Sequence, residues 1–171
     1  MGHLTGYPVE SWFLDRLLAA RKPILMTHVD PDADGLGSQV AFYEAARAIG
    51  VDAHIVNDDP IPERFAWVDP GACVADFEQR SELLEGADLG LIFDAHDVSR
   101  AGRPAQWLQR AGVDILVVDH HPVAEGSDVS GLVAVDYSST GELCYRLLET
   151  LGWPVSKRAA HALYAAISFD T

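Results

Sequence analysis

The sequence has little cysteine, no long hydrophobic run and no export signal, and each absence narrows the class of protein. Its 171 residues include only two cysteines, Cys73 and Cys144, which are too few for the disulfide framework of a secreted domain. No apolar stretch approaches the ~18 residues that a membrane span requires. The first six residues lack both the basic start and the apolar core of a signal peptide. We therefore expect a cytoplasmic protein with no membrane partner.

Basic residues are also scarce. The chain has 12 Lys and Arg against 26 Asp and Glu, which gives a formal net charge of −14. A surface this acidic repels a nucleic-acid backbone, so a long duplex is not an expected partner. Most of the acids are expected to form a solvated coat. The informative question is whether some of them converge on one place, because only a bound cation would make such a cluster tolerable.

Hydrophobic residues make up 49% of the chain, which is enough for the core of one domain over residues 1–171. Short apolar runs typical of strands occur at residues 24–27, 52–56, 89–93, 114–118 and 132–135. Patterns that predict helices occur at residues 9–20, 36–49, 104–111, 139–151 and 156–169. Between residues 57 and 69 we expect a loop with one helical turn. Strands that alternate with helices and are apolar on both faces predict an α/β fold, a parallel sheet with helices on both faces.

Acidic and histidine side chains follow three of the predicted strands. They are His28, Asp32 and Asp34 after residues 24–27, Asp94, His96 and Asp97 after residues 89–93, and Asp119, His120 and His121 after residues 114–118. In open parallel sheets, ligands bind in the crevice beyond the carboxyl ends of the strands. The three groups are therefore expected to meet in one crevice.

Such a crevice would bring several carboxylates within a few ångströms of one another, where they repel strongly near a low-dielectric core. They can share a site only if some stay protonated or if cations neutralise them. Carboxylates mixed with imidazoles suit a divalent ion such as Mn²⁺, Mg²⁺ or Zn²⁺. With this many ligands, two ions that share a bridging carboxylate are more natural than one. Paired ions of this kind serve the hydrolysis of phosphate esters.

Each group also has a purely structural interpretation. Residues 30–35 read Asp-Pro-Asp-Ala-Asp-Gly, which suits a turn and a helix cap, and the acid that would close a calcium loop is missing. Asp94 alone would be an ordinary turn residue. His120 and His121 are harder to explain in this way, because neither capping nor packing requires two imidazoles after an apolar strand. Taken together, the three groups favour a metal site.

The same residues resemble the four ordered motifs of the DHH family of phosphoesterases. The motifs are residues 28–38, then Asp94, then Asp119-His120-His121, then Asp170-Thr171. The form Pro-Asp-x-Asp-Gly-x-Gly-Ser in the first motif is most similar to the branch that cleaves very short oligonucleotides and dephosphorylates 3′-phosphoadenosine 5′-phosphate. The resemblance spans residues 24–171. It implies hydrolysis by a water that two Mn²⁺ ions activate, with Mg²⁺ as the alternative ion.

The resemblance also implies a role for individual residues. It places His28, Asp32 and Asp94 on one ion, and Asp34, Asp94, His120 and Asp170 on the other, so that Asp94 bridges the pair. His121 is the implied catalytic residue, which faces the substrate phosphate as an electrophile or proton donor. Asp119 is expected to support the histidines or the loop. His96 and Asp97 match no ligand, so we expect a supporting or surface-turn role for them. Only the family pattern makes Asp170 a ligand, since on composition it merely ends an amphipathic helix.

Two arginines follow the second motif in an otherwise acidic chain, and either Arg100 or Arg103 would suit a phosphate. Arg100 is the preferred substrate-binding candidate because it is closer to Asp94, and a solvated surface pair is the alternative. The expected partners are short nucleic-acid fragments or a nucleotide. Related proteins commonly dimerise, so a homodimer is a further expectation to test.

Other activities use the same kind of ion pair. An inorganic pyrophosphatase of the related two-domain type and a single-strand exonuclease of the RecJ kind are the alternative enzymes, and the acidic charge argues against the exonuclease. A non-catalytic metal-binding module is the alternative of another class. Members of this branch continue after the fourth motif into a second domain that grips the substrate, which these 171 residues lack. We therefore predict that this polypeptide binds Mn²⁺ and hydrolyses nucleotides weakly or without selectivity.

Overall fold

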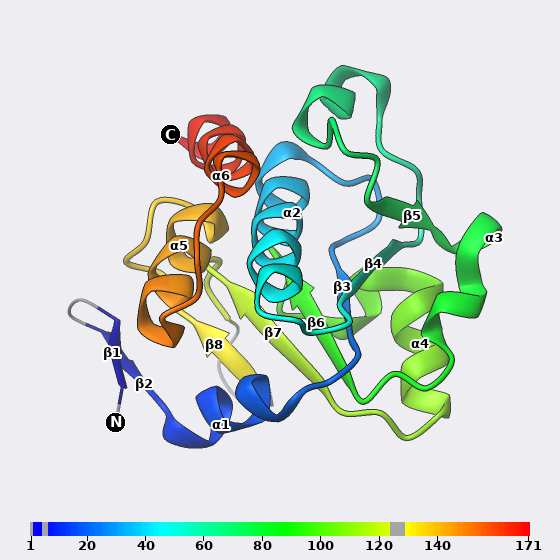
Figure 1. Cartoon of the computed structure of the whole chain (residues 1–171), viewed down its shortest axis with the longest axis horizontal. Helices are drawn as coiled ribbons and strands as arrows, with labels where there is room; N and C mark the ends of the chain where they lie inside the picture. The colour runs from blue at the N-terminus through cyan, green and yellow to red at the C-terminus, as the bar shows by residue number, and fades with distance from the viewer. Residues whose placement is uncertain (1, 5–6, 124–128) are drawn as a thin grey trace.

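The chain folds around a six-stranded sheet with helices on both faces (Figure 1). The computed structural model describes residues 2–4, 7–123 and 129–171. The strands of the sheet are β3 (Pro23–Met26), β4 (His54–Asn57), β5 (Val74–Asp76), β6 (Leu89–Phe93), β7 (Ile115–Asp119) and β8 (Gly131–Val133). A separate hairpin near the N-terminus pairs β1 (Gly2–Leu4) with β2 (Tyr7–Val9).

Helices and 3₁₀ turns connect these strands. The α-helices are α1 (Ser11–Ala19), α2 (Ala33–Ala48), α3 (Phe77–Arg80), α4 (Gly102–Arg110), α5 (Thr140–Leu151) and α6 (Lys157–Asp170). The 3₁₀ helices are η1 (Glu63–Val68), η2 (Ser81–Leu84) and η3 (Val98–Ala101). Within the described parts of the chain, no helix is both long enough and apolar enough to cross a bilayer.

The strand order places a topological switch point at the centre of the sheet. All neighbouring strands are parallel, in the order β5-β4-β3-β6-β7-β8. From β3 the chain moves outward through β4 to β5, and it then returns to β6 beside β3 and moves outward the other way. The connections that follow β3 and β6 therefore diverge, which opens a crevice beyond the carboxyl ends of these two strands.

Most of the core consists of two hydrophobic layers, one on each face of the sheet, and a smaller cluster lies between α2, η1 and α6. Leu25 of β3 and Leu91 of β6 lie in the layer that α1, α2, α5 and α6 cover. Their chain neighbours Met26 and Ile92 lie in the opposite layer, which α4 covers. Successive residues of a strand point to opposite faces, so a central strand must be apolar throughout to fill both layers. Both strands are buried along their whole length.

Close packing of α6 on α2 determines where the end of α6 lies. A Cβ atom on Gly37 of α2 would lie 2.3 Å from the carbonyl oxygen of Ala162 and 2.9 Å from the Cβ atom of Ala166, both on α6. Only glycine permits this approach without a shift of one helix. In the last turn of α6, Asp170 reaches the segment after β7, where it lies beside His120.

The structure confirms the α/β fold, and it differs from the sequence-based expectations at the start of one helix and in several short elements. The helix expected from residue 36 begins at Ala33, so Asp34 lies in its first turn and not in the preceding loop. The strand β5 and the β1–β2 hairpin were not predicted. Each of these strands has only three residues, which is too short for an alternating pattern to be distinguished from a loop.

Candidate metal centre

The first part of the site lies where β3 ends and α2 begins. Asp32 is the N-cap residue of α2, and its Oδ1 accepts hydrogen bonds from the amides of Asp34 (3.0 Å) and Gly35 (3.1 Å). Its Oδ2 lies 3.6 Å from Nε2 of His28. The Nδ1 of His28 lies 2.8 Å from the carbonyl oxygen of Val29 and donates to it, since a carbonyl only accepts. The Nε2 of His28 is therefore the ring nitrogen that faces the carboxylates.

Asp94, directly after β6, lies between His28 and His120. Its backbone has a φ of 63°, an uncommon conformation for a residue with a side chain, and its amide donates to the carbonyl of Val118 at 3.0 Å. Its Oδ2 lies 3.6 Å from Nε2 of His28, and its Oδ1 lies 3.8 Å from Nε2 of His120. The two oxygens of this buried carboxylate thus face two different imidazoles, as those of a bridging ligand do.

His120 and two further acids form the other part of the site. The Nε2 of His120 lies 3.0 Å from Oδ2 of Asp170 and 3.7 Å from Oδ2 of Asp34. Its Nδ1 lies 3.4 Å from the carbonyl oxygen of Tyr137, so here too the Nε2 faces the carboxylates. Asp34 comes from the first turn of α2, His120 follows β7, and Asp170 ends α6. Residues from three elements therefore meet at this point.

The N-terminus of α5 holds two of the carboxylates in place. The amides of Thr140 and Gly141 donate to the two oxygens of Asp34, each at 2.8 Å. The hydroxyl of Thr140 donates to Oδ1 of Asp94 at 2.9 Å. Helix N-termini favour negative charge, because their first amides lack partners within the helix. These contacts fix the orientation of Asp34 and Asp94 before any ligand binds.

The acids of the site lack a protein cation other than histidine. Among the described residues, no lysine or arginine forms a salt bridge with Asp34, Asp94 or Asp170. Burial, and then the charge of Asp94, raise the pKa of Asp34 to about 9, and the same two causes raise the pKa of Asp170. Hydrogen bonds with Asp32 and Asp94 raise the pKa of His28 to about 10. Without a cation, the folded chain retains protons here that its acids would ordinarily lose.

These residues fit a pair of divalent ions. The Nε2 of His120 is buried and has no hydrogen-bond partner among the described residues, although Oδ2 of Asp170 is 3.0 Å away. Around an octahedral ion with bonds of about 2.1 Å, adjacent ligand atoms are about 3 Å apart and opposite ones about 4.2 Å. Three groups have ligand atoms within 4.8 Å of one another: His28, Asp32 and Asp94; Asp34, His120 and Asp170; Asp94, His120 and His121. Carboxylates mixed with histidines whose Nδ1 is held by a carbonyl suit Mn²⁺, Mg²⁺ or Zn²⁺.

Asp119, the last residue of β7, holds two histidines at the edge of the site. Its Oδ1 lies 2.8 Å from Nδ1 of His121, and its Oδ2 lies 2.7 Å from Nδ1 of His96. Burial alone would raise the pKa of Asp119, but the hydrogen bonds with His121 and His96 hold it below its ordinary value. Burial opposes charge on His121 as well, yet its hydrogen bond with Asp119 keeps its pKa raised. The side chain of His121 is 46% exposed, so a substrate can reach it.

The two arginines that follow β6 differ in their surroundings. Arg100 is exposed and lies in η3, where its carbonyl accepts a hydrogen bond from the amide of Val29 at 2.7 Å. Its guanidinium forms no salt bridge with a described acid. Arg103 instead pairs with Asp58 and Glu78 and lies over the ring of Phe77. Arg100 is therefore the arginine whose side chain is available to a ligand.

The structure brings most of the predicted site residues together. His28, Asp32, Asp34, Asp94, His120, His121 and Asp170 all belong to the groups described above. Arg100 lies outside those groups, and Asp97 caps η3 through a hydrogen bond from the amide of Ser99 at 2.9 Å. Sequence reasoning missed Thr140 and Gly141, which look only like the start of a helix. Nothing in the sequence indicates that this helix start faces Asp34, 106 residues earlier.

A cluster of histidine and aspartate side chains thus lies at the switch point of this parallel α/β domain. The chain matches the model of the DHH family, N-terminal domain, over residues 22–167. It therefore belongs to the DHH family, whose members are phosphoesterases.

Three curated relatives are identical to the chain at about a quarter of the aligned residues. The bifunctional oligoribonuclease and PAP phosphatase NrnA of Thermus thermophilus is 27% identical over 161 residues, which cover 91% of this chain and 45% of the relative. The Bacillus subtilis protein of the same name is 27% identical over 153 residues, covering 86% and 45%. A probable manganese-dependent inorganic pyrophosphatase of Streptococcus mutans is 26% identical over 153 residues, covering 88% and 48%. The chain thus spans about half the length of these relatives.

The fold also matches a solved structure. A crystal structure of an exopolyphosphatase-related protein from Bacteroides fragilis superposes with a TM-score of 0.83 at 22% identity, covering 94% of this chain and 49% of that one. At this identity the match establishes the shared fold alone.

Proposed function

We propose that the chain is the catalytic domain of a phosphoesterase that hydrolyses short oligonucleotides or nucleotide phosphates such as 3′-phosphoadenosine 5′-phosphate. One observation carries the proposal. Asp94, a buried carboxylate at the switch point of the sheet, directs its two oxygens at two histidines whose other ring nitrogens are held by carbonyls. The two relatives named as oligoribonuclease and PAP phosphatase support this choice of substrate.

The proposed cofactor is a pair of Mn²⁺ ions, with Mg²⁺ as the alternative. One ion would be held by His28, Asp32 and Asp94, and the other by Asp34, Asp94, His120 and Asp170. When bound, the ions would lower the pKa of a water molecule and neutralise charge that develops on the phosphate. The manganese-dependent relative supports this choice of metal.

The chain's own groups would orient the ligands and the substrate. The Thr140 and Gly141 amides keep Asp34 from turning away, and the Thr140 hydroxyl does the same for Asp94. His121 is half-exposed, and its Nδ1 is engaged by Asp119, so its Nε2 is free to contact the substrate phosphate. Arg100 would bind a phosphate oxygen away from the reacting bond, since its side chain is exposed and its guanidinium forms no salt bridge with a described acid.

Inorganic pyrophosphate is the second candidate substrate. The pyrophosphatase relative covers nearly the same share of the chain at nearly the same identity as the other relatives. Both substrates offer a phosphate to the metal site, and they differ only in what lies beyond it. A long single strand fits the proposal poorly, because the net charge of −14 would repel its backbone.

The test compares three substrates with the 171-residue chain. Phosphate release from 3′-phosphoadenosine 5′-phosphate, phosphate release from pyrophosphate, and mononucleotide release from a dinucleotide are measured with Mn²⁺, with Mg²⁺ and after chelation. Bound manganese is quantified by elemental analysis in the same samples. We expect Mn²⁺-dependent turnover of the nucleotide substrates that chelation abolishes. Faster turnover of pyrophosphate would favour the second candidate. Two bound Mn²⁺ ions with no hydrolysis of any substrate would refute the proposed activity.

A further inference from the structure

The carboxylate of Asp119 connects two imidazoles from neighbouring strands. Its side chain is fully buried, and it accepts from Nδ1 of His96 at 2.7 Å, from Nδ1 of His121 at 2.8 Å and from the amide of His121 at 3.2 Å. His96 follows β6 and His121 follows β7, so the two rings approach Asp119 from different strands. The oxygen that contacts His96 is Oδ2, and the one that contacts His121 is Oδ1.

These contacts define which atom of each ring faces away from Asp119. An ionised carboxylate only accepts hydrogen bonds, so each Nδ1 carries the proton of its own hydrogen bond to Asp119. The Nε2 of His121 is then left for the substrate side, where the ring is 46% exposed. The ring of His96 is less exposed, at 26%, and it belongs to none of the groups of candidate metal ligands. The role of His96 is therefore to be found in its contact with Asp119.

We propose that His96 is a positioning residue that acts on His121 through Asp119. By engaging Oδ2, His96 fixes the rotation of the buried carboxylate, so that Oδ1 stays directed at Nδ1 of His121 and the imidazole presents Nε2 to the substrate phosphate. Without His96, Oδ2 would be a buried acceptor with no partner among the described residues, and the carboxylate would turn toward other donors. This inference rests on the proposed function, in which His121 contacts the phosphate.

The decisive comparison is between two variants at residue 96. His96→Asn keeps a nitrogen donor close to the position of Nδ1, because both atoms are bonded to Cγ, whereas His96→Leu has similar bulk and no donor. We expect His96→Leu to lower kcat by at least about 10-fold and His96→Asn to stay within about 3-fold of the parent chain. Manganese stoichiometry and affinity are expected to be unchanged in both variants, because neither His96 nor Asp119 is a proposed ligand. Loss of manganese from His96→Leu would overturn the proposal, since His96 would then act on the metal centre itself.

A second measurement does not depend on activity. The ring N–H proton of His121 is observed by NMR with ¹⁵N-labelled histidine, in the metal-free chain and with diamagnetic Mg²⁺. A hydrogen bond to a buried carboxylate shifts this proton downfield and slows its exchange with water. We expect the signal in the parent chain and in His96→Asn, and its loss through faster exchange in His96→Leu. Circular dichroism confirms that both variants are folded.

The two measurements separate the two proposals. If the parent chain binds manganese but hydrolyses nothing, the proposed function fails, and the His121 signal alone decides the positioning role. Retention of that signal in His96→Leu overturns the role of His96 whether or not the chain is an enzyme. Unchanged kcat in His96→Leu overturns it as well.

Discussion

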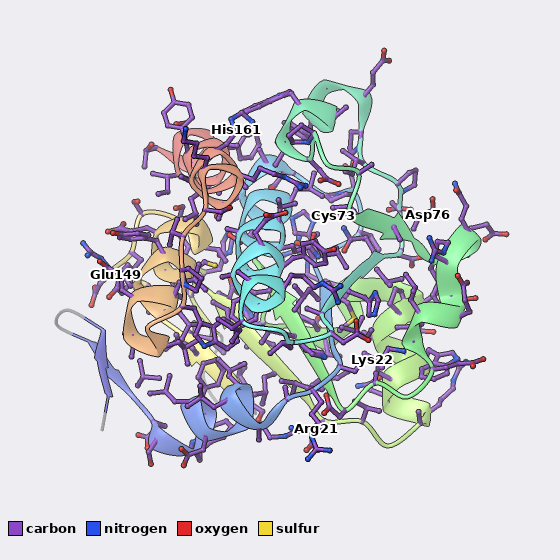
Figure 2. The ribbon with its side chains drawn as sticks, viewed as in Figure 1. Arg21, Lys22, Cys73, Asp76, Glu149 and His161 are labelled. Carbon is purple, nitrogen blue, oxygen red and sulfur yellow. The ribbon has the colours of Figure 1, made fainter. Side chains whose placement is uncertain are left out.

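The two ends of the sheet carry acidic residues in different surroundings. At the amino end, the carboxylate of Asp88 accepts from the amides of Arg21 (2.8 Å) and Lys22 (3.0 Å), and Arg16 forms a salt bridge with Asp114 at 3.5 Å. Arg21 and Lys22 lie at the opposite end of the molecule from His161 of α6 (Figure 2). At the carboxyl end, Asp34, Asp94 and Asp170 gather with imidazoles and without any described lysine or arginine.

The difference shows which acids need a partner from outside the protein. The acids at the amino end are exposed to water or paired, and water or their partners stabilise their charge. Asp34 and Asp94 are buried next to each other, and the pKa of Asp34 rises to about 9 in consequence. Two amides and a hydroxyl orient these carboxylates but do not neutralise them. A divalent cation would neutralise these carboxylates. The carboxyl end of the sheet is therefore the end that we associate with metal binding.

The largest expected effect comes from substitution of Asp94, at the carboxyl end of the sheet. Asp94→Asn removes the charge that both proposed ion positions share, while its shape is kept. We expect manganese affinity to fall by at least about 100-fold and hydrolysis to be abolished. Isothermal titration calorimetry and the phosphate-release assay measure the two effects.

The matched control for Asp94→Asn is Asp88→Asn at the amino end. This variant weakens the acceptor of two backbone amides, so the free energy of unfolding should fall by about 1 kcal/mol, with metal binding and turnover unchanged. Chemical unfolding in urea measures the stability of both variants. Equal losses of manganese affinity in the two variants would show that the ends of the sheet do not differ as described.

Removal of the metal should make stability depend on pH. The carboxyl of Asp34 changes from its ordinary pKa of 3.8 to about 9 on folding, so between these values the folded state keeps a proton that the unfolded chain has lost. Raising the pH in this range therefore lowers the free energy of unfolding. His28, whose pKa rises from 6.5 to about 10, acts in the same direction above its ordinary value. The chelated chain should thus be less stable at about pH 9 than at about pH 6.5.

Metal binding should reverse this pH dependence. In the proposed site one ion must displace the proton of His28 and the other the proton of Asp34, so the manganese affinity of each position should rise with pH by up to about 10-fold per unit, for one proton released per ion. Titration calorimetry in buffers of different ionisation enthalpy counts the protons, and urea unfolding with and without Mn²⁺ measures the stability. Affinity that is independent of pH, with no proton release, would contradict the pKa values assigned to the two groups.

The strands of the core could be predicted because they are short apolar runs that end in polar residues. The same reasoning placed His28, Asp94 and His120 at one edge, since parallel strands end there together. The position of Asp170 could not be derived in this way. It depends on the close packing of α6 against Gly37, a contact between helices that are far apart in the sequence.

The contacts that orient the candidate ligands could also not be predicted from the sequence. Thr140 begins a helix, and a threonine at that position usually needs no further explanation. Its amide and hydroxyl reach Asp34 and Asp94 only because α5 lies against α2 at the carboxyl end of the sheet. For the same reason, the contact between His96 and Asp119 depends on the pairing of β6 with β7. Local patterns indicate most of the candidate ligands, and tertiary packing determines the contacts that orient them.

The smallest expected effect concerns the arginines near the carboxyl end. It tests whether the positive charge that binds the substrate phosphate comes from the metal ions alone. Arg100→Ala removes an exposed guanidinium with no described acidic partner within salt-bridge distance, so we expect KM for 3′-phosphoadenosine 5′-phosphate to rise by about 10-fold, with kcat little changed. Arg103→Ala is the control, because Asp58 and Glu78 already hold its side chain. Its KM should stay within about 2-fold of the parent value, with at most a small loss of stability. Since the Arg100 contact would be exposed, its effect on KM should shrink as salt is raised. Equal KM values for the two variants would contradict a role for Arg100 in substrate binding, and the ions and His121 would then be the remaining candidates for that role.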